Sequence, residues 1–160
     1  MSNSANLSHK HQMSEEDAKN YIFSHSGKGN AGATLFTIEN RVTGHRHTYK
    51  VRKARDKDMF FIKAMTGSDN ETSYTYLGYV FGNDPGSMRR GAKGKMENPQ
   101  TKIGQSVIYF NWLLRQLFGS SDNFNQIHFW HHGTCGRCGR RLTVPTSIEN
   151  GIGPECARRA

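Results

Sequence analysis

The sequence predicts an α+β fold in which a small antiparallel β-sheet, a meander, is covered by one helix and is followed by a separate C-terminal module. Three observations lead to this prediction. Between residues 33 and 82, β-branched and aromatic residues come in short runs with a period of two. From 103 to 117, apolar residues recur at helical spacing. The three cysteines of the chain all lie between 135 and 156.

The chain is expected to begin with a disordered tail at residues 1–13, which are polar and show no periodicity. Ser14 can cap a helix, because a serine hydroxyl accepts a hydrogen bond from the first turn, and acidic residues follow it directly. Ala18 and Ile22 give this helix an apolar side, and the glycine-rich stretch at 26–32 ends it. The helix therefore opens the α+β domain.

Four strands are predicted next, at 34–39, 47–54, 59–65 and 74–81. Their connections are short, which favours antiparallel neighbours and hence a four-stranded meander. A sheet of this size needs an apolar partner, and the stripe from 103 to 117 supplies a helix of about four turns that covers one face. A last strand at 126–130 leads towards the cysteines.

A glycine-rich basic loop is predicted at 82–100, between the sheet and its covering helix. The α+β domain is expected to span 14–124, and the C-terminal module 125–160. The aromatic side chains of the strands are expected to be core residues and cross-strand partners; they are Phe60, Phe61, Tyr74, Tyr76, Tyr79 and Phe81.

The cysteines have the spacing of a structural zinc site. Cys135 and Cys138 form a Cys-x-x-Cys turn, which presents two thiolates from one bend, and Cys156 follows after seventeen intervening residues. Because the chain has no further cysteine, the fourth ligand is expected to be a histidine just upstream. His131 is the first choice and His132 the alternative, since one step along a strand decides which imidazole faces the metal. We therefore expect one Zn²⁺ in a zinc-knuckle module.

Two other interpretations of the cysteines are weaker. Cys135 and Cys138 could be a redox pair, but a thioredoxin-like motif belongs at the start of a helix in a βαβ pattern, which the sequence lacks. A catalytic zinc would need an open coordination position and a general base, for which Glu155 is the nearby acid. A structural site is therefore favoured.

The segment from Cys135 to Cys156 resembles the C-terminal signature of an uncharacterised family of small tailed-phage and prophage proteins. The shared residues read Cys-Gly-x-Cys-Gly-Arg, then Leu-Thr-x-Pro-x-Ser-Ile, then Gly-Ile-Gly-Pro-x-Cys. Upstream, a histidine followed by x-Gly-x-Cys matches His131 to Cys135, and a Tyr-x-Tyr-Leu-Gly pattern matches residues 74–78. The resemblance implies zinc binding, with His131 favoured over His132, and a phage origin. It implies no biochemical activity.

The net charge of +9 gives the chain a long-range attraction for polyanions such as DNA and RNA. Basic residues cluster in three segments near aromatic ones, so the favoured function is non-catalytic nucleic-acid binding. The candidate binding residues are Lys50, Arg52, Lys53, Arg55, Arg89, Arg90, Lys93, Lys95, Arg137, Arg140 and Arg141. The alternative for each of them is a charge that only solvates the surface of a small basic protein.

A second candidate function is a phage-encoded inhibitor that binds a host protein, such as a defence enzyme or a nucleic-acid-processing enzyme. An enzyme is disfavoured: residues 27–32 fit GxGxxG, but they follow a helix and precede a strand, the reverse of a dinucleotide-binding turn. The sequence has no run of about eighteen apolar residues and no apolar signal at its start. We expect a cytoplasmic protein with no membrane partner, in the host cell if phage-encoded; its oligomeric state stays open.

Overall fold

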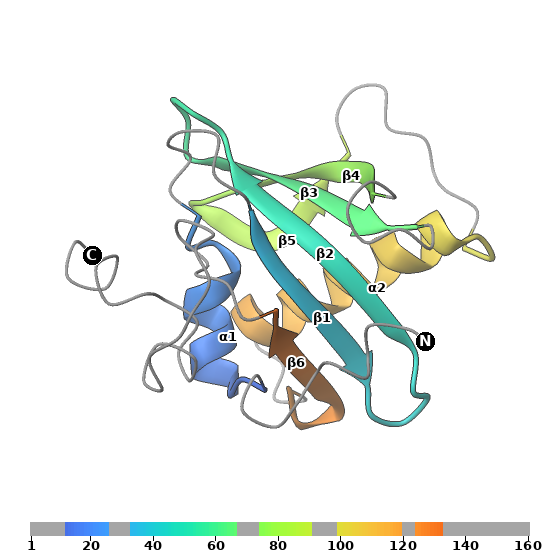
Figure 1. The fold of residues 1–160 in the computed structure, drawn as a ribbon. Helices are drawn as coiled ribbons and strands as arrows, with labels where there is room; N and C mark the ends of the chain where they lie inside the picture. The colour runs from blue at the N-terminus through green and yellow to red at the C-terminus, as the bar shows by residue number, and fades with distance from the viewer. Residues whose placement is uncertain (1–11, 26–32, 67–73, 91–98, 120–123, 133–160) are drawn as a thin grey trace.

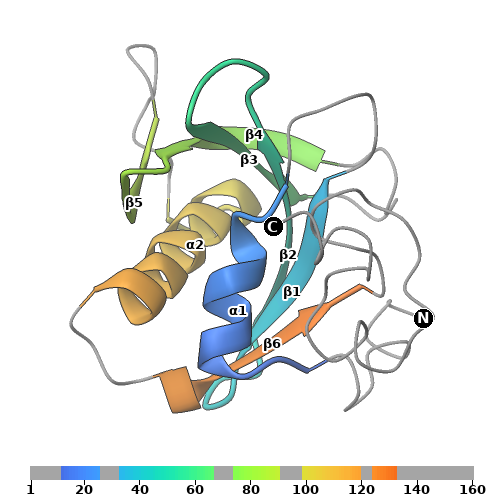
Figure 2. The ribbon, with the colours of Figure 1, turned by 90° about the vertical axis from the view of Figure 1, so that its left-hand side faces the viewer.

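A computed structural model describes residues 12–25, 33–66, 74–90, 99–119 and 124–132. These residues form a curled antiparallel sheet of six strands, with two helices packed on one of its faces (Figures 1 and 2). The strand order is β5-β4-β3-β2-β1-β6. The elements are α1 (Glu15–Ile22), β1 (Thr34–Asn40), β2 (Arg46–Lys53), β3 (Met59–Met65), β4 (Tyr74–Phe81), β5 (Asp84–Arg89), α2 (Lys102–Phe118), the 3₁₀ turn η3 (Phe124–Gln126) and β6 (Ile127–His131).

The predicted α+β class and antiparallel sheet are confirmed, as are the four strands of the meander, the last strand and the helix along 103–117. Two details of the prediction are wrong. The sheet has six strands rather than four, because β5 and β6 extend the meander at its two edges. Both helices cover the sheet, whereas the sequence pattern assigned this role to one helix.

β5 lies inside the region that the sequence predicts as a loop, because its residues, Asp-Pro-Gly-Ser-Met-Arg, show neither alternation nor β-branching. The strand forms at the sheet edge, where a proline is tolerated. Met88 is buried, and its amide donates to Asn111 Oδ1 of α2 at 3.0 Å. Gly78 of β4 allows the close approach, since a Cβ there would collide with the carbonyl oxygen of Arg89. Tertiary contacts rather than local propensity therefore create β5.

α2 is held on the sheet by apolar packing and by a buried hydrogen bond. Thr101 caps its start, with its hydroxyl oxygen accepting from the amide of Gly104 at 3.0 Å. The hydroxyl of Tyr49 on β2, a fully buried residue, donates to the carbonyl of Ser106 at 2.7 Å. The apolar side chains that α2 buries are Phe110, Leu113, Leu114 and Leu117. The stripe read from the sequence is thus the face that meets the sheet.

α1 packs beside α2 at the end of the sheet that carries β1 and β6 (Figure 2). Ser14 caps it as predicted. Tyr21 is fully buried, and its ring meets that of Phe129 on β6 edge to face, with centroids 6.3 Å apart. Before the helix, the amide of Met13 donates to the carbonyl of Phe129 at 2.7 Å. The last part of the predicted tail therefore lies against β6, while residues 1–11 lie outside the described residues.

β6 belongs to the same sheet as the meander, pairing with β1 so that His131 lies opposite Phe36. Residues 127–131, which the sequence analysis assigned to the C-terminal module, thus continue the sheet. The rest of that module, 133–160, lies outside the described residues, and so does the zinc knuckle predicted there. In the part of the chain that the structure describes, neither helix is long and apolar enough to cross a membrane.

Candidate nucleic-acid interface

The two faces of the sheet differ because successive side chains of a strand point to opposite sides. On β2, Tyr49 and Val51 are buried on the side of the helices, whereas Lys50 and Arg52 point the other way. We call this second side the outer face. Figure 2 shows α1 and α2 together on the opposite side of the sheet, so no described helix covers the outer face.

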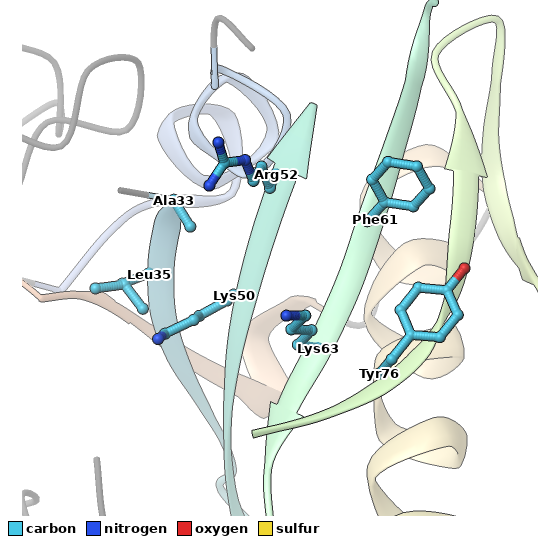
Figure 3. A pocket seen from close by; sticks show the side chains of 7 residues that line it. All are labelled: Ala33, Leu35, Lys50, Arg52, Phe61, Lys63 and Tyr76. Carbon is cyan, nitrogen blue, oxygen red and sulfur yellow. The ribbon is translucent and has the colours of Figure 1, made fainter. Parts of the chain in front are cut away.

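A groove of about 590 Å³ lies on the outer face over β1, β2, β3 and β4 (Figure 3). Its described lining is cationic and apolar, without an acidic residue: Ala33, Leu35, Lys50, Arg52, Phe61, Lys63 and Tyr76. Strand register brings these side chains together. Lys50 lies opposite Leu35 on one side and Lys63 on the other, and Arg52 lies opposite Phe61. We call this feature the sheet groove.

Two aromatic rings form one side of the sheet groove. The rings of Phe61 on β3 and Tyr76 on β4 have centroids 6.3 Å apart and planes inclined by 57°, and Tyr76 is 49% exposed. Figure 3 shows Lys50 and Lys63 between these rings and Leu35. Burial raises the pKa of the Tyr76 hydroxyl above its ordinary value, so the ring is uncharged at neutral pH. The groove therefore offers neutral aromatic surface beside ammonium groups.

The side chain of Lys50 also contacts an aromatic ring that lies outside the groove lining. Its Nζ lies 4.1 Å from the ring centroid of Tyr74 on β4, a cation–π contact that fixes the ammonium over the outer face. Burial also raises the pKa of the Tyr74 hydroxyl. The Tyr74 hydroxyl therefore stays protonated at neutral pH, and the contact with Lys50 is a cation–π contact rather than an ion pair.

Towards β6, the outer face carries a cluster of charged groups around Glu39. Arg46 Nε lies 2.8 Å from one carboxylate oxygen, and His128 Nδ1 lies 3.0 Å from the other. Burial raises the pKa of Glu39, but the hydrogen bonds from Arg46 and His128 outweigh it, and the pKa lies below its ordinary value. The guanidinium of Arg46 also lies over Trp130, 5.1 Å from the ring centroid. The charge of Glu39 is therefore balanced locally, away from the groove.

The two candidate histidine ligands lie at the end of β6 and face opposite sides of the sheet. His131 is fully buried, with its ring centroid 5.9 Å from that of Tyr21. His132 lies on the outer face, where its Nε2 is 2.7 Å from the hydroxyl oxygen of Thr37; that oxygen is also 2.7 Å from the hydroxyl of Thr48. The cysteines lie outside the described residues, so the choice between the histidines stays open.

The segment that begins on β6 is similar to a known family. Residues 128–160 match a family of unknown function, DUF6011. The match includes both candidate histidines and the three cysteines. No curated protein and no solved structure matches the chain. The similarity thus concerns the C-terminal segment, whereas the sheet groove precedes it in the sequence.

The structure brings only some of the predicted basic residues into the groove. Lys50 and Arg52 line it. Lys53 instead donates from Nζ to the carbonyls of Ala54 and Lys57, at 3.4 and 3.0 Å. The exposed Arg55 follows in the turn after β2.

The other predicted basic residues lie at the β5 edge or beyond the description. Arg89 reaches over the ring of Phe81, 5.0 Å from its centroid, and pairs with Asp84 at 3.1 Å. Arg90 directly follows β5. Five more lie outside the described residues: Lys93, Lys95, Arg137, Arg140 and Arg141.

Five residues of the groove lining were not among the predicted binding residues: Ala33, Leu35, Phe61, Lys63 and Tyr76. The expectation that the strand aromatics lie in the core is confirmed for Phe60, which is buried. Phe61 and Tyr76 are cross-strand neighbours, as expected, but on the outer face. Alternation along β3 could have placed Phe61 and Lys63 outward. Tyr76 lies opposite Lys63 because of a register shift after Ile62; Gly78, within β4 at that shift, is a sequence signal for a bulge, although it does not fix the register.

Proposed function

We propose that this protein binds nucleic acid without catalysis through the outer face of its sheet, and that its C-terminal segment carries a structural zinc ion. The observation that supports the first part is the sheet groove. It joins Lys50, Arg52 and Lys63 with exposed aromatic surface, and its described lining contains no acid. The positive charge of these side chains is complementary to the negative sugar-phosphate backbone of a nucleic acid.

The physical basis of binding is the release of counterions. A cationic side chain that neutralises a phosphate frees a condensed counterion, so the affinity falls as salt rises. The net charge of +9 adds a long-range attraction that is independent of sequence. The described lining of the groove has neither a carboxylate nor an imidazole, and the proposal assigns no reaction to it.

The zinc part of the proposal rests on the chemistry of the donor set. Cys135, Cys138 and Cys156 supply three thiolates, and His131, with His132 as the alternative, supplies the imidazole at the end of β6. A site of this composition contributes folding energy to the segment that holds it. The proposed zinc would therefore stabilise the chain that directly follows the sheet.

The proposed setting is the cytoplasm of a bacterial host during phage growth. It rests on the resemblance of the C-terminal signature to phage and prophage proteins. The same resemblance suggests a second function, inhibition of a host protein. No feature of the described structure favours that function over nucleic-acid binding.

The test of the proposal is a fluorescence anisotropy titration of labelled DNA and RNA at several salt concentrations. The groove variant is Lys50→Gln with Lys63→Gln. The matched control is Lys102→Gln with Arg115→Gln, which removes the same charge from α2 on the opposite side of the sheet. We expect the groove variant to reduce the slope of log affinity against log salt by about 1.4, since each phosphate contact with a single strand contributes about 0.7.

The control variant should keep the slope of the unchanged protein. Equal losses in the two variants would show that only net charge matters, and would overturn the assignment of the groove. An absence of salt-dependent binding to every probe would overturn the proposed function itself.

A further inference from the structure

We propose that the sheet groove selects single-stranded over double-stranded nucleic acid, with unpaired bases stacking on Tyr76 and Phe61 while Lys50, Arg52 and Lys63 hold the backbone. This inference rests on the proposed function and specifies its ligand.

The rings are placed where a base can reach them. Tyr76 is 49% exposed although it lies on a strand within the sheet, and the ring of Phe61 stands beside it on the next strand. Figure 3 shows both rings along the same side of the groove. An aromatic ring binds a nucleobase by stacking on its π-face, which is available in a single strand. In a duplex the bases are stacked on each other, so these rings would find no partner.

Two of the cations, Lys50 and Lys63, lie next to each other without an acidic residue in the described lining of the groove. Lys50 and Lys63 lie directly opposite each other on β2 and β3. Like charges in this position destabilise a sheet. The described lining of the groove contains no carboxylate to offset them, and Glu39 is engaged by Arg46 and His128. A phosphate bound between the ammonium groups would relieve their repulsion.

The helices are not positioned to read a duplex. Proteins commonly enter the major groove of B-DNA with an α-helix or a two-stranded ribbon. Here α1 and α2 lie on the side of the sheet opposite the cations and rings (Figure 2). α2 also buries its apolar stripe against the core. Among the described elements, the surface that carries both charge and exposed rings is therefore the open sheet, which fits an extended strand.

The experiment compares four probes of equal length with the full chain purified with zinc: single-stranded DNA, single-stranded RNA, duplex DNA and a single strand of abasic sites. The abasic strand keeps the phosphates but offers no base. We expect both single strands to bind at least about tenfold more tightly than the duplex, and the abasic strand to lose about tenfold.

The variants separate stacking from charge. Tyr76→Leu keeps apolar bulk but removes the ring, and we expect about a tenfold loss of affinity for single strands with little change for the abasic strand. Tyr76→Phe keeps the ring and should bind as the unchanged protein does. Circular dichroism verifies that each variant is folded.

Two outcomes would overturn the inference and leave the proposed function standing: equal affinity for single strands and duplex, or no effect of Tyr76→Leu while Lys50→Gln with Lys63→Gln still weakens binding. Failure of all four probes to bind would overturn both. Where both single strands bind more tightly than the duplex, a preference between DNA and RNA identifies the sugar that the groove accepts.

Discussion

Lys50 and Lys63 occupy directly opposed positions on β2 and β3, so two like charges extend from neighbouring strands in the floor of the sheet groove. A residue pair selected for stability alone would combine opposite charges at such a position. The arrangement is consistent with the proposed binding of an anion at this part of the sheet, at some expense of stability.

The first prediction follows from this pair. Lys63→Glu should raise the free energy of unfolding by about 0.2–1 kcal/mol, because it replaces cross-strand repulsion by attraction. The same change should weaken nucleic-acid binding. Urea denaturation and anisotropy measure the two effects. Lys102→Glu on α2 is the control for the binding measurement; a loss of stability in Lys63→Glu would contradict the assignment of repulsion to this pair.

The second prediction concerns the buried bond between the sheet and α2. Tyr49→Phe removes the hydroxyl that donates to the Ser106 carbonyl at 2.7 Å and leaves that carbonyl buried without this donor. We expect a loss of about 1–2 kcal/mol in unfolding free energy. Tyr109→Phe is the matched control, because the Tyr109 hydroxyl meets His45 Nδ1 at an exposed site, at 3.1 Å. If Tyr109→Phe lost as much unfolding free energy as Tyr49→Phe, the larger effect expected for a buried hydrogen bond would be contradicted.

The third prediction is a dependence of stability on pH that originates at His47 of β2, which is 7% exposed. Burial, followed by the positive charges of Lys102 and His45, lowers the pKa of His47 from 6.5 to about 4. Between these values the unfolded chain binds a proton that the folded protein does not, so stability falls as the pH decreases through this window.

The loss attributable to His47 should reach up to about 2 kcal/mol between pH 7 and pH 5, since each pH unit corresponds to about 1.36 kcal/mol. His47→Phe keeps a ring for the stacked contact with Tyr109, whose centroid lies 4.6 Å away, and should lose less stability over this range. Urea midpoints at the two pH values test this. His45→Gln is the control, and an equal effect of both changes would contradict the role of His47.

The strands of the meander and α2 could be predicted from the sequence because their signals are local. Alternation along β2 agrees with the structure, in which Tyr49 lies in the core and Lys50 on the opposite face. β5 could not be predicted, because Pro85 and Gly86 hide it and it forms through pairing with β4 and burial of Met88 beside α2. The burial of an edge strand against a helix depends on residues that are far apart in the sequence, so a short sequence window cannot predict it.

The candidate site could be predicted only in part for a similar reason. Lys50 and Arg52 were identified from charge, and alternation along β3 could have added Lys63. The pairing of Lys63 with Tyr76 depends on the register shift after Ile62, which skips Leu77. A shift of one residue moves a side chain to the other face. The position of Tyr76 in the groove thus results from a bulge, which Gly78 within β4 signals without fixing the register.

The last prediction concerns the proposed zinc. Cys138→Ser should remove most of the metal and expose residues 133–160 to proteolysis, while the sheet keeps its circular dichroism, because its described core contains no cysteine.

His131→Ala should alter the absorption of the Co²⁺-substituted protein, because the predicted site loses its imidazole. His132→Ala should leave that spectrum unchanged. The opposite result for the two histidines would assign the ligand to His132, whose Nε2 lies beside Thr37 and whose Nδ1 would then bind the metal. Protein without metal would contradict the zinc proposal.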